Sequence, residues 1–319
     1  MTKNIDKVLL TNPILKQEHE RLSQHAEVII APNTDGDTLR SLIADVDGLI
    51  VRAKLPDDIF DYQKQLKGVV RHGVGLDMIP MAQATKKGIP VANIPGSNTA
   101  SVVEYCLNAM FYLRRNMGRL NIDKKALDWD TTRAHANGMS ELAGQTLGIV
   151  GVGAIGGALA KVADALGMRV AGLVRRKESL PPYIQFLDKK ELFSQADIIV
   201  LSCPLTQETR GLVDSQTLAL MKPNALLINV SRGPVVQTQA LVQALLDKKL
   251  GGAALDVHDV QPITPGLYPG LLNNLLLTPH VAGITESSMA NMSTGSVDEM
   301  LRALQGQRFA HLVNPEIYA

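Results

Sequence analysis

The sequence has few cysteines, almost no net charge and no long apolar segment, and each absence excludes a class of protein. Cys106 and Cys203 are the only cysteines and lie far apart, which argues against a disulfide scaffold or a metal site and favours a reducing, cytoplasmic location. A net charge of +1 provides no field for nucleic acid. The most apolar stretch, 147–160, is interrupted by glycines and is shorter than the roughly 18 residues of a membrane helix. We therefore expect neither nucleic acid nor membrane as a partner. The N-terminal residues 1–7 also lack the apolar core of a signal peptide.

The segment 146–176 has the pattern of a dinucleotide-binding unit. It contains, in order, an apolar run (147–150), the glycines Gly151, Gly153 and Gly156 in the spacing G-x-G-x-x-G, an alanine-rich helix (158–166) and a second apolar run (170–174). Gly151 permits a tight turn, Gly153 permits close approach of a pyrophosphate, and Gly156 permits close packing of helix on strand. Ala154 and Ile155 open the helix, whose N-terminus favours the anion. The pattern predicts a site for a nicotinamide dinucleotide.

The end of the second apolar run indicates which dinucleotide is bound. NAD sites usually have an acidic residue there for the ribose 2′-hydroxyl. This chain has Val174, Arg175 and Arg176, and no carboxylate before Glu178. Because a guanidinium matches two phosphate oxygens, the sequence favours NADP(H), with NAD(H) as the alternative.

Elsewhere the chain alternates short apolar runs with helix-compatible segments, which predicts parallel sheets built from βαβ units. The expected strands of the first part are 8–10, 28–30, 49–51, 68–70 and 90–93. Those after the glycine unit are 197–201, 225–230, 252–255 and 275–278. Two long helices, 100–115 and 288–304, are expected to connect two domains, so that a dinucleotide-binding domain is inserted between the body and the tail of the first.

Six segments in order resemble the D-2-hydroxyacid dehydrogenase family, in particular glyoxylate/hydroxypyruvate reductases. They are R-H-G-V-G-L-D (71–77), G-V-G-A-I-G (151–156), L-S-C-P-L-T (201–206), N-V-S-R-G (229–233), A-L-D-V (254–257) and T-P-H-V-A-G (278–283). The resemblance implies an α/β fold of two doubly wound parallel-sheet domains. A Rossmann dinucleotide-binding domain (99–288) is inserted into a flavodoxin-like substrate domain (1–98 and 289–319). It also implies hydride transfer between NAD(P)(H) and a small 2-oxo or 2-hydroxy acid.

Three residues carry the chemistry that the resemblance implies. Arg232 would bind the substrate carboxylate and carbonyl oxygen in a bidentate manner. His280 would protonate the carbonyl oxygen in reduction or accept the hydroxyl proton in oxidation. Most family members pair this histidine with a glutamate, whereas this chain has Gln261, which can orient an imidazole but cannot stabilise its charge. Asp259 is an alternative source of that charge.

The resemblance implies further contacts. Backbone N–H groups of Val74 and Gly75, together with Arg52, would contact the substrate. The remaining cofactor contacts would come from Cys203, Pro204, Val230, Asp256 and Gly283. The segment 127–139 resembles the arm through which family members form homodimers.

Two other functions remain open. Formate dehydrogenases resemble this family and also carry glutamine at the position of Gln261, so formate or phosphite oxidation is one alternative. A catalytically silent dinucleotide sensor is the other, although Arg232 and His280 argue against it.

Overall fold

The computed structural model describes residues 5–120, 129–264, 266–268 and 274–318. The chain folds into two compact units. Unit 1 contains residues 1–98 and 284–319, and unit 2 contains residues 99–283. The sequence predicted that the inserted domain ends at residue 288, whereas unit 2 ends at residue 283. The molecule that each unit binds stays a prediction.

Unit 1 contains a parallel five-stranded sheet in the order β2-β1-β3-β4-β5. Its strands are β1 (Lys7–Leu10), β2 (Glu27–Ile30), β3 (Gly48–Val51), β4 (Gly68–Arg71) and β5 (Val91–Ala92). This is the flavodoxin-like order, in which the chain reverses direction between β1 and β3.

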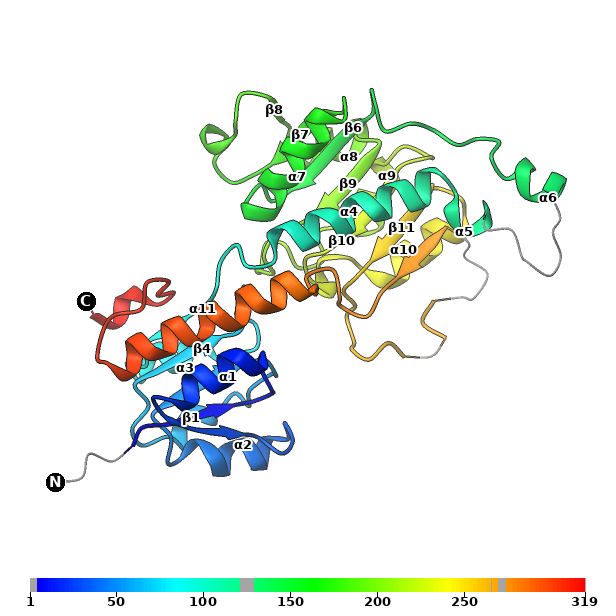
Figure 1. The fold of residues 1–319 in the computed structure, drawn as a ribbon. Coiled ribbons are helices and arrows are strands. Elements are labelled where there is room, and N and C mark those ends of the chain that lie inside the picture. The colour runs from blue at the N-terminus through cyan, green and yellow to red at the C-terminus, as the bar shows by residue number, and fades with distance from the viewer. Residues whose placement is uncertain (1–4, 121–128, 265, 269–273, 319) are drawn as a thin grey trace. The chain divides into compact units, whose positions relative to one another are not determined.

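Helices cover both faces of the unit 1 sheet (Figure 1). They are α1 (Lys16–Ser23), α2 (Gly36–Ile43), α3 (Met81–Lys86) and α11 (Glu286–Leu304), with 3-10 turns at η1 (Ile59–Asp61) and η4 (Pro315–Tyr318). Successive strand residues point to opposite faces. Accordingly Val8 and Leu10 pack with Met300 of α11 in one cluster, whereas Leu9 packs with Ile43 of α2 in another. The apolar runs are therefore buried on both sides.

Unit 2 contains a parallel seven-stranded sheet in the order β12-β11-β10-β9-β6-β7-β8. Its strands are β6 (Thr146–Val150), β7 (Arg169–Leu173), β8 (Ile184–Phe186), β9 (Ile198–Leu201), β10 (Leu226–Asn229), β11 (Gly252–Leu255) and β12 (Leu275–Leu277). This is the doubly wound Rossmann order extended by one strand, with the reversal between β6 and β9. Such folds bind ligands at the carboxyl ends of the strands on either side of the reversal.

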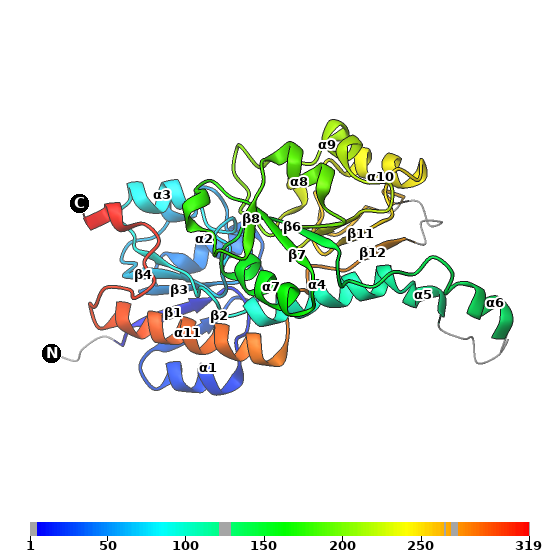
Figure 2. The same cartoon turned by 90° about the horizontal axis from the view of Figure 1, so that it is seen from above.

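The helices of unit 2 also lie on both faces of its sheet. They are α4 (Thr99–Arg114), α5 (Met117–Leu120), α6 (Trp129–Ala134), α7 (Ala154–Ala165), α8 (Lys189–Gln195), α9 (Ser215–Leu220) and α10 (Thr238–Leu246), with 3-10 turns at η2 (Lys177–Ser179) and η3 (Gly233–Val235). Figure 2 shows α4 and α7 on one face and α8, α9 and α10 on the other. Two apolar clusters fill the two spaces between sheet and helices.

The α/β class, the parallel sheets and the long helices were predicted correctly. The short strand β8 was not predicted, because its residues Ile184, Gln185 and Phe186 form no apolar run and only Ile184 is buried. None of the helices in the described part of the chain is long and apolar enough to cross a membrane.

Candidate active site

All the candidate residues of unit 2 follow the carboxyl ends of strands in one parallel sheet. The glycine turn follows β6, the arginine pair follows β7, and Cys203 follows β9. Arg232 follows β10, Asp256 follows β11, and His280 follows β12. Because the carboxyl ends of parallel strands share an edge, residues more than a hundred positions apart line one side of this sheet.

The glycine turn has the geometry that each glycine was expected to provide. Gly151 has a φ of +90°, and a Cβ added there would lie 2.7 Å from the Cα of Cys203. A Cβ at Gly156 would lie 2.3 Å from the carbonyl oxygen of Gly151. A Cβ on Gly153 would meet no described atom within 4 Å, and Gly153 is exposed at the N-terminus of α7. The turn therefore leaves open space where a pyrophosphate would approach the first N–H groups of the helix.

Arg175 and Arg176 follow β7. In the sheet, β6 with its glycine turn lies between β7 and β9. Arg175 and Arg176 are exposed, and a nitrogen of Arg175 lies 3.2 Å from a carboxylate oxygen of Glu208. The ion pair between Arg175 and Glu208 is largely solvated, so it contributes little to the stability of the fold. The guanidinium of Arg175 therefore remains available to an anion that binds it more strongly than Glu208 does.

Arg232 is held by the backbone that follows β10. The side-chain amide of the buried Asn229 donates to the carbonyl of Arg232 at 3.0 Å, and its oxygen accepts from the N–H and hydroxyl of Ser231. A Cβ on Gly233 would lie 2.1 Å from the carbonyl carbon of His258. Gly233 therefore allows the turn that carries Arg232 to pack directly on the segment that leads to Gln261.

His280 contacts Gln261, as the family pairing suggests. Its Nδ1 lies 3.4 Å from Oε1 of Gln261, at the long end of hydrogen-bonding distance. The carboxylate of Asp259 instead accepts from the hydroxyl of Thr238 at 2.8 Å. The neutral amide, and not the nearby carboxylate, is thus the neighbour of the imidazole Nδ1.

A buried carboxylate organises the turn on which His280 lies. Asp256 is 1% exposed and accepts from the hydroxyl of Thr278 at 2.6 Å and from the N–H groups of Val281 and Ala282 at 2.8 and 2.9 Å. Its carbonyl also accepts from the N–H of His280, whose φ is +58°. These bonds stabilise an uncommon backbone conformation for a non-glycine residue.

Three aromatic side chains, Tyr105, His258 and Tyr268, extend this network. The hydroxyl of Thr278 donates to Asp256, so the hydroxyl of Tyr105 donates to Thr278, at 2.7 Å. Burial raises the pKa of Tyr105 to about 12. On the other side, Nε2 of His258 donates to the carbonyl of Thr278 and its Nδ1 accepts from Tyr268. Neither Tyr105 nor Thr278 was predicted from the sequence as a site residue, since their importance arises only from this packing.

The other predicted cofactor contacts differ in accessibility. Cys203 is 7% exposed, and burial raises the pKa of its thiol. Pro204 is exposed, whereas Val230 and Gly283 are partly exposed. A cofactor could therefore contact Pro204 and Val230 directly, but only the edge of Cys203.

The predicted substrate contacts Arg52, Val74 and Gly75 belong to unit 1. Arg52 follows β3, beside the point where the strand order reverses, and its backbone N–H donates to the hydroxyl of Thr11 at 2.8 Å. Burial lowers the pKa of Arg52. Val74 and Gly75 follow β4 at the same edge of the sheet and are partly exposed. These residues therefore share the carboxyl edge of the unit 1 sheet.

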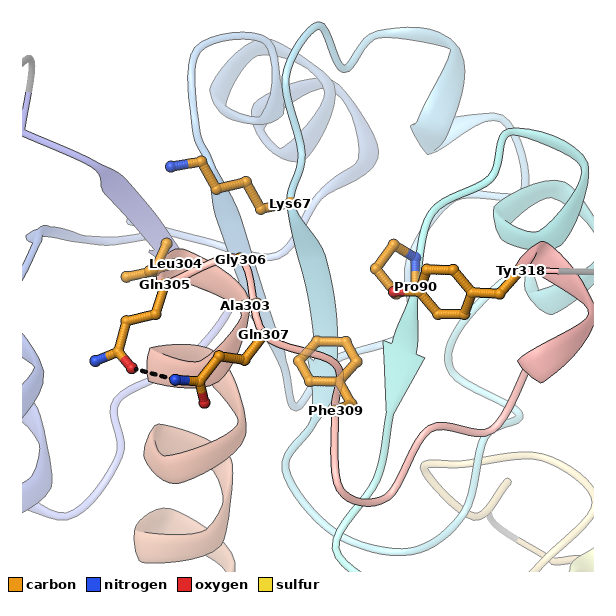
Figure 3. Close-up of a pocket in the computed structure, with 9 residues that line it drawn as sticks. All are labelled: Lys67, Pro90, Ala303, Leu304, Gln305, Gly306, Gln307, Phe309 and Tyr318. Atoms are coloured by element: carbon orange, nitrogen blue, oxygen red, sulfur yellow. Dashed lines mark hydrogen bonds between the residues drawn. The ribbon is translucent and has the colours of Figure 1, made fainter.

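A recess of about 500 Å³ lies at the opposite edge of that sheet. It is lined by Lys67 and Pro90, which precede β4 and β5, and by residues at the end of α11 and beyond (Figure 3). Phe309 and Tyr318 contribute aromatic walls, and the recess contains none of the predicted site residues. It is unrelated to the predicted chemistry.

The predicted dimerisation arm is described in part. Leu127 and Asp128 lie outside the described residues, while α6 follows from Trp129. None of the residues of α6 is buried, and Trp129 is 63% exposed. An exposed helix with an exposed tryptophan is compatible with the dimer contact, which stays a prediction.

The fold and these motifs match known proteins over nearly the whole chain. A hydroxypyruvate reductase of Thermotoga maritima is 31% identical over 93% of this chain and 98% of its own length. A D-3-phosphoglycerate dehydrogenase of Methanocaldococcus jannaschii is 34% identical over 97% of this chain, but this chain spans only 59% of that relative. The structure of an NADPH-dependent glyoxylate/hydroxypyruvate reductase of Sinorhizobium meliloti superposes with a TM-score of 0.86 at 27% identity, covering 97% of each chain.

The family model described as "D-isomer specific 2-hydroxyacid dehydrogenase, NAD binding domain" matches residues 107–282. This range contains β6 with its glycine turn, Arg232 and His280. Together with the relatives, it identifies the chain as a member of the D-isomer specific 2-hydroxyacid dehydrogenase family.

Proposed function

We propose that this protein transfers a hydride between NADP(H) and a small 2-oxo or 2-hydroxy acid, with unit 2 binding the dinucleotide and unit 1 contributing substrate contacts. The observation that carries the proposal is the common edge of the unit 2 sheet. This edge presents an open glycine turn, the guanidinium of Arg232, which can bind two oxygens at once, and the imidazole of His280. These are the groups that hydride transfer to a 2-oxo acid requires.

Each residue has a distinct proposed task. Arg232 binds the carboxylate and polarises the carbonyl of the acid, because a planar guanidinium can contact two oxygens at once. His280 delivers the proton to the carbonyl oxygen in reduction. Gln261 orients the imidazole through Nδ1, as the 3.4 Å contact supports. The dinucleotide supplies the hydride when it is bound.

NADP(H) is the proposed cofactor. The support is the exposed pair Arg175 and Arg176 after β7, with Val174 in place of a ribose-binding acid. The pyrophosphate would lie at Gly151, Gly153, Ala154, Ile155 and Gly156. Pro204, Val230, Gly283 and the edge of Cys203 would border the rest of the dinucleotide, and Asp256 would accept from the nicotinamide carboxamide.

Steady-state kinetics tests this proposal. Wild-type protein should reduce at least one of glyoxylate, hydroxypyruvate and pyruvate, with NADPH preferred over NADH. His280→Ala should abolish turnover, and Arg232→Lys should lower kcat/KM on the order of 100-fold because the bidentate geometry is lost. Arg302→Lys, at an exposed position of α11, is the matched control. The absence of any turnover, or an Arg232→Lys variant as active as this control, would overturn the proposal.

Formate or phosphite oxidation is the second candidate, and the contact between Gln261 and His280 is the observation that favours it. Oxidation of formate releases no hydroxyl proton, so it does not need a charged partner for the histidine. Reduction of NADP⁺ by formate or phosphite, without activity on any 2-oxo acid, would favour this candidate.

A further inference from the structure

The loop formed by residues 72–75, directly after β4, is held through each of its carbonyl groups. Arg71 donates through Nη1 to the carbonyl of His72 and through Nε to that of Gly75, the latter at 3.0 Å. The N–H of Ile94 donates to the carbonyl of Gly73 at 2.8 Å. The side-chain amide of Asn93 donates to the carbonyl of Val74 at 2.7 Å. The four consecutive carbonyls 72–75 therefore all point toward donors of unit 1.

The N–H groups of this loop are used differently. Those of His72 and Gly73 donate to the carbonyls of Val51 and Arg71. Within the part of the chain that the structure describes, no acceptor contacts the N–H of Val74 or Gly75. Both residues are only partly buried, so these two donors are available to a ligand. Consecutive free N–H groups in a turn are a recognised anion-binding arrangement.

The surrounding charges favour an anion at the loop. Arg71 anchors the loop, and Arg52 lies near enough to influence His72. Burial, together with these two arginines, lowers the pKa of His72 to about 3. His72 therefore stays neutral, and its Nε2 lies 2.9 Å from the hydroxyl of Ser293. The guanidinium of Arg52 donates through Nη1 to the carbonyl of Pro13, a neutral acceptor that leaves its positive charge in place.

We propose that Arg71 and Asn93 are positioning residues that hold the carbonyls of 72–75 inward, so that the N–H groups of Val74 and Gly75 bind the substrate carboxylate. This inference rests on the proposed function, because it assigns how the same substrate is recognised. Arg71 is suited to the task since Nε and Nη1 of one planar group reach two carbonyls that are three residues apart. Asn93, directly after β5, fixes the carbonyl between them.

Two substitutions remove these anchors. Arg71→Met removes the donors to His72 and Gly75. Asn93→Asp removes the donor to Val74 and places an acceptor against its carbonyl. Each should raise the KM for the 2-oxo acid about 10- to 100-fold, the range expected when charge-assisted hydrogen bonds are lost. The Kd for NADPH should not change. Arg71→Lys, which retains a cation but cannot reach both carbonyls, should give an intermediate KM.

Matched controls separate positioning from general loss of stability. Arg40→Met removes an arginine of α2 that bonds Asp58 and Asp37. Asn314→Asp removes a side-chain amide that donates at 2.9 Å to the carbonyl of Ile89, away from the loop. Both controls should lower the melting temperature without changing KM. If Arg71→Met and Asn93→Asp keep the wild-type KM, or if the controls raise it equally, the inference is overturned.

A binding measurement distinguishes failure of the inference from failure of the proposed function. Oxamate, an isostere of pyruvate that accepts no hydride, is titrated into the NADPH-loaded protein while the amide resonances of Val74 and Gly75 are followed by NMR. They should shift in the wild type and in both controls, but not in Arg71→Met or Asn93→Asp. Wild-type turnover without these shifts overturns the positioning role alone. Shifts without turnover of any 2-oxo acid overturn the proposed reaction and support the positioning role.

Discussion

Gln261 predicts an unusual pH dependence for the reductive direction, and Gln261→Glu tests it. The substitution places a negative charge at the atom now 3.4 Å from Nδ1 of His280. Gln261 is exposed, so the charge is screened by solvent and a water-like dielectric applies. At that distance a pair of unit charges then interacts by about 1 kcal/mol, which corresponds to roughly one pH unit of titration.

The sign of the effect follows from which form of the histidine is active. Reduction requires the imidazolium as proton donor, and an adjacent carboxylate stabilises the imidazolium. His280 therefore remains protonated to a higher pH in Gln261→Glu. The alkaline limb of kcat/KM for reduction should move upward by about one pH unit, the shift estimated from the pair distance.

The assay is the pH profile of kcat/KM with NADPH and one good 2-oxo acid. Asp259→Asn is the matched control, because the carboxylate of Asp259 accepts from Thr238, whereas Nδ1 of His280 faces Gln261. It should move the limb much less than Gln261→Glu. A limb that shifts down in Asp259→Asn and stays in place in Gln261→Glu would identify Asp259 as the charged partner and refute this reasoning. His280→Ala confirms that the measured limb belongs to catalysis.

Three further predictions concern the cofactor, the glycine turn and assembly. Replacing Arg175 and Arg176 together by alanine should weaken NADPH binding about 10- to 100-fold and leave NADH binding nearly unchanged in fluorescence titrations; equal losses would contradict the NADP(H) assignment. Gly151→Ala should destabilise unit 2 by about 1–3 kcal/mol in thermal or denaturant unfolding, because its Cβ would overlap neighbouring backbone. Gly153→Ala should retain stability but lose dinucleotide affinity, since a Cβ there meets only open space; equal stabilities of the two variants would contradict this account. The protein should be a homodimer in light scattering at micromolar concentration, and the mass of a single chain would refute that expectation.

Much of the fold was predictable because buried parallel strands are nearly continuous apolar runs. Residues 198–201 and 226–229 are buried throughout. Because both faces of these strands are buried, the strands could be identified in the sequence as apolar runs. The glycine turn was predictable for a similar reason, since a φ of +90° at Gly151 and the close approach at Gly156 exclude other residues. The strand β8 forms no such apolar run, because only one of its residues is buried.

The sequence by itself indicated the candidate functional side chains and the strand ends that they follow. It could not determine hydrogen-bond partners, because these depend on distances between segments far apart in the chain. By family position Gln261 was the expected neighbour of His280, and Asp259 was an alternative source of charge that the sequence could neither place nor exclude. In the folded chain Asp259 accepts from Thr238, whereas Nδ1 of His280 faces Gln261. Asp256 was predicted as a cofactor contact, yet the tertiary structure also makes it the acceptor that shapes the turn carrying His280. Such a role exists only after β11 and β12 have aligned, since pairing of parallel strands is what brings their ends together.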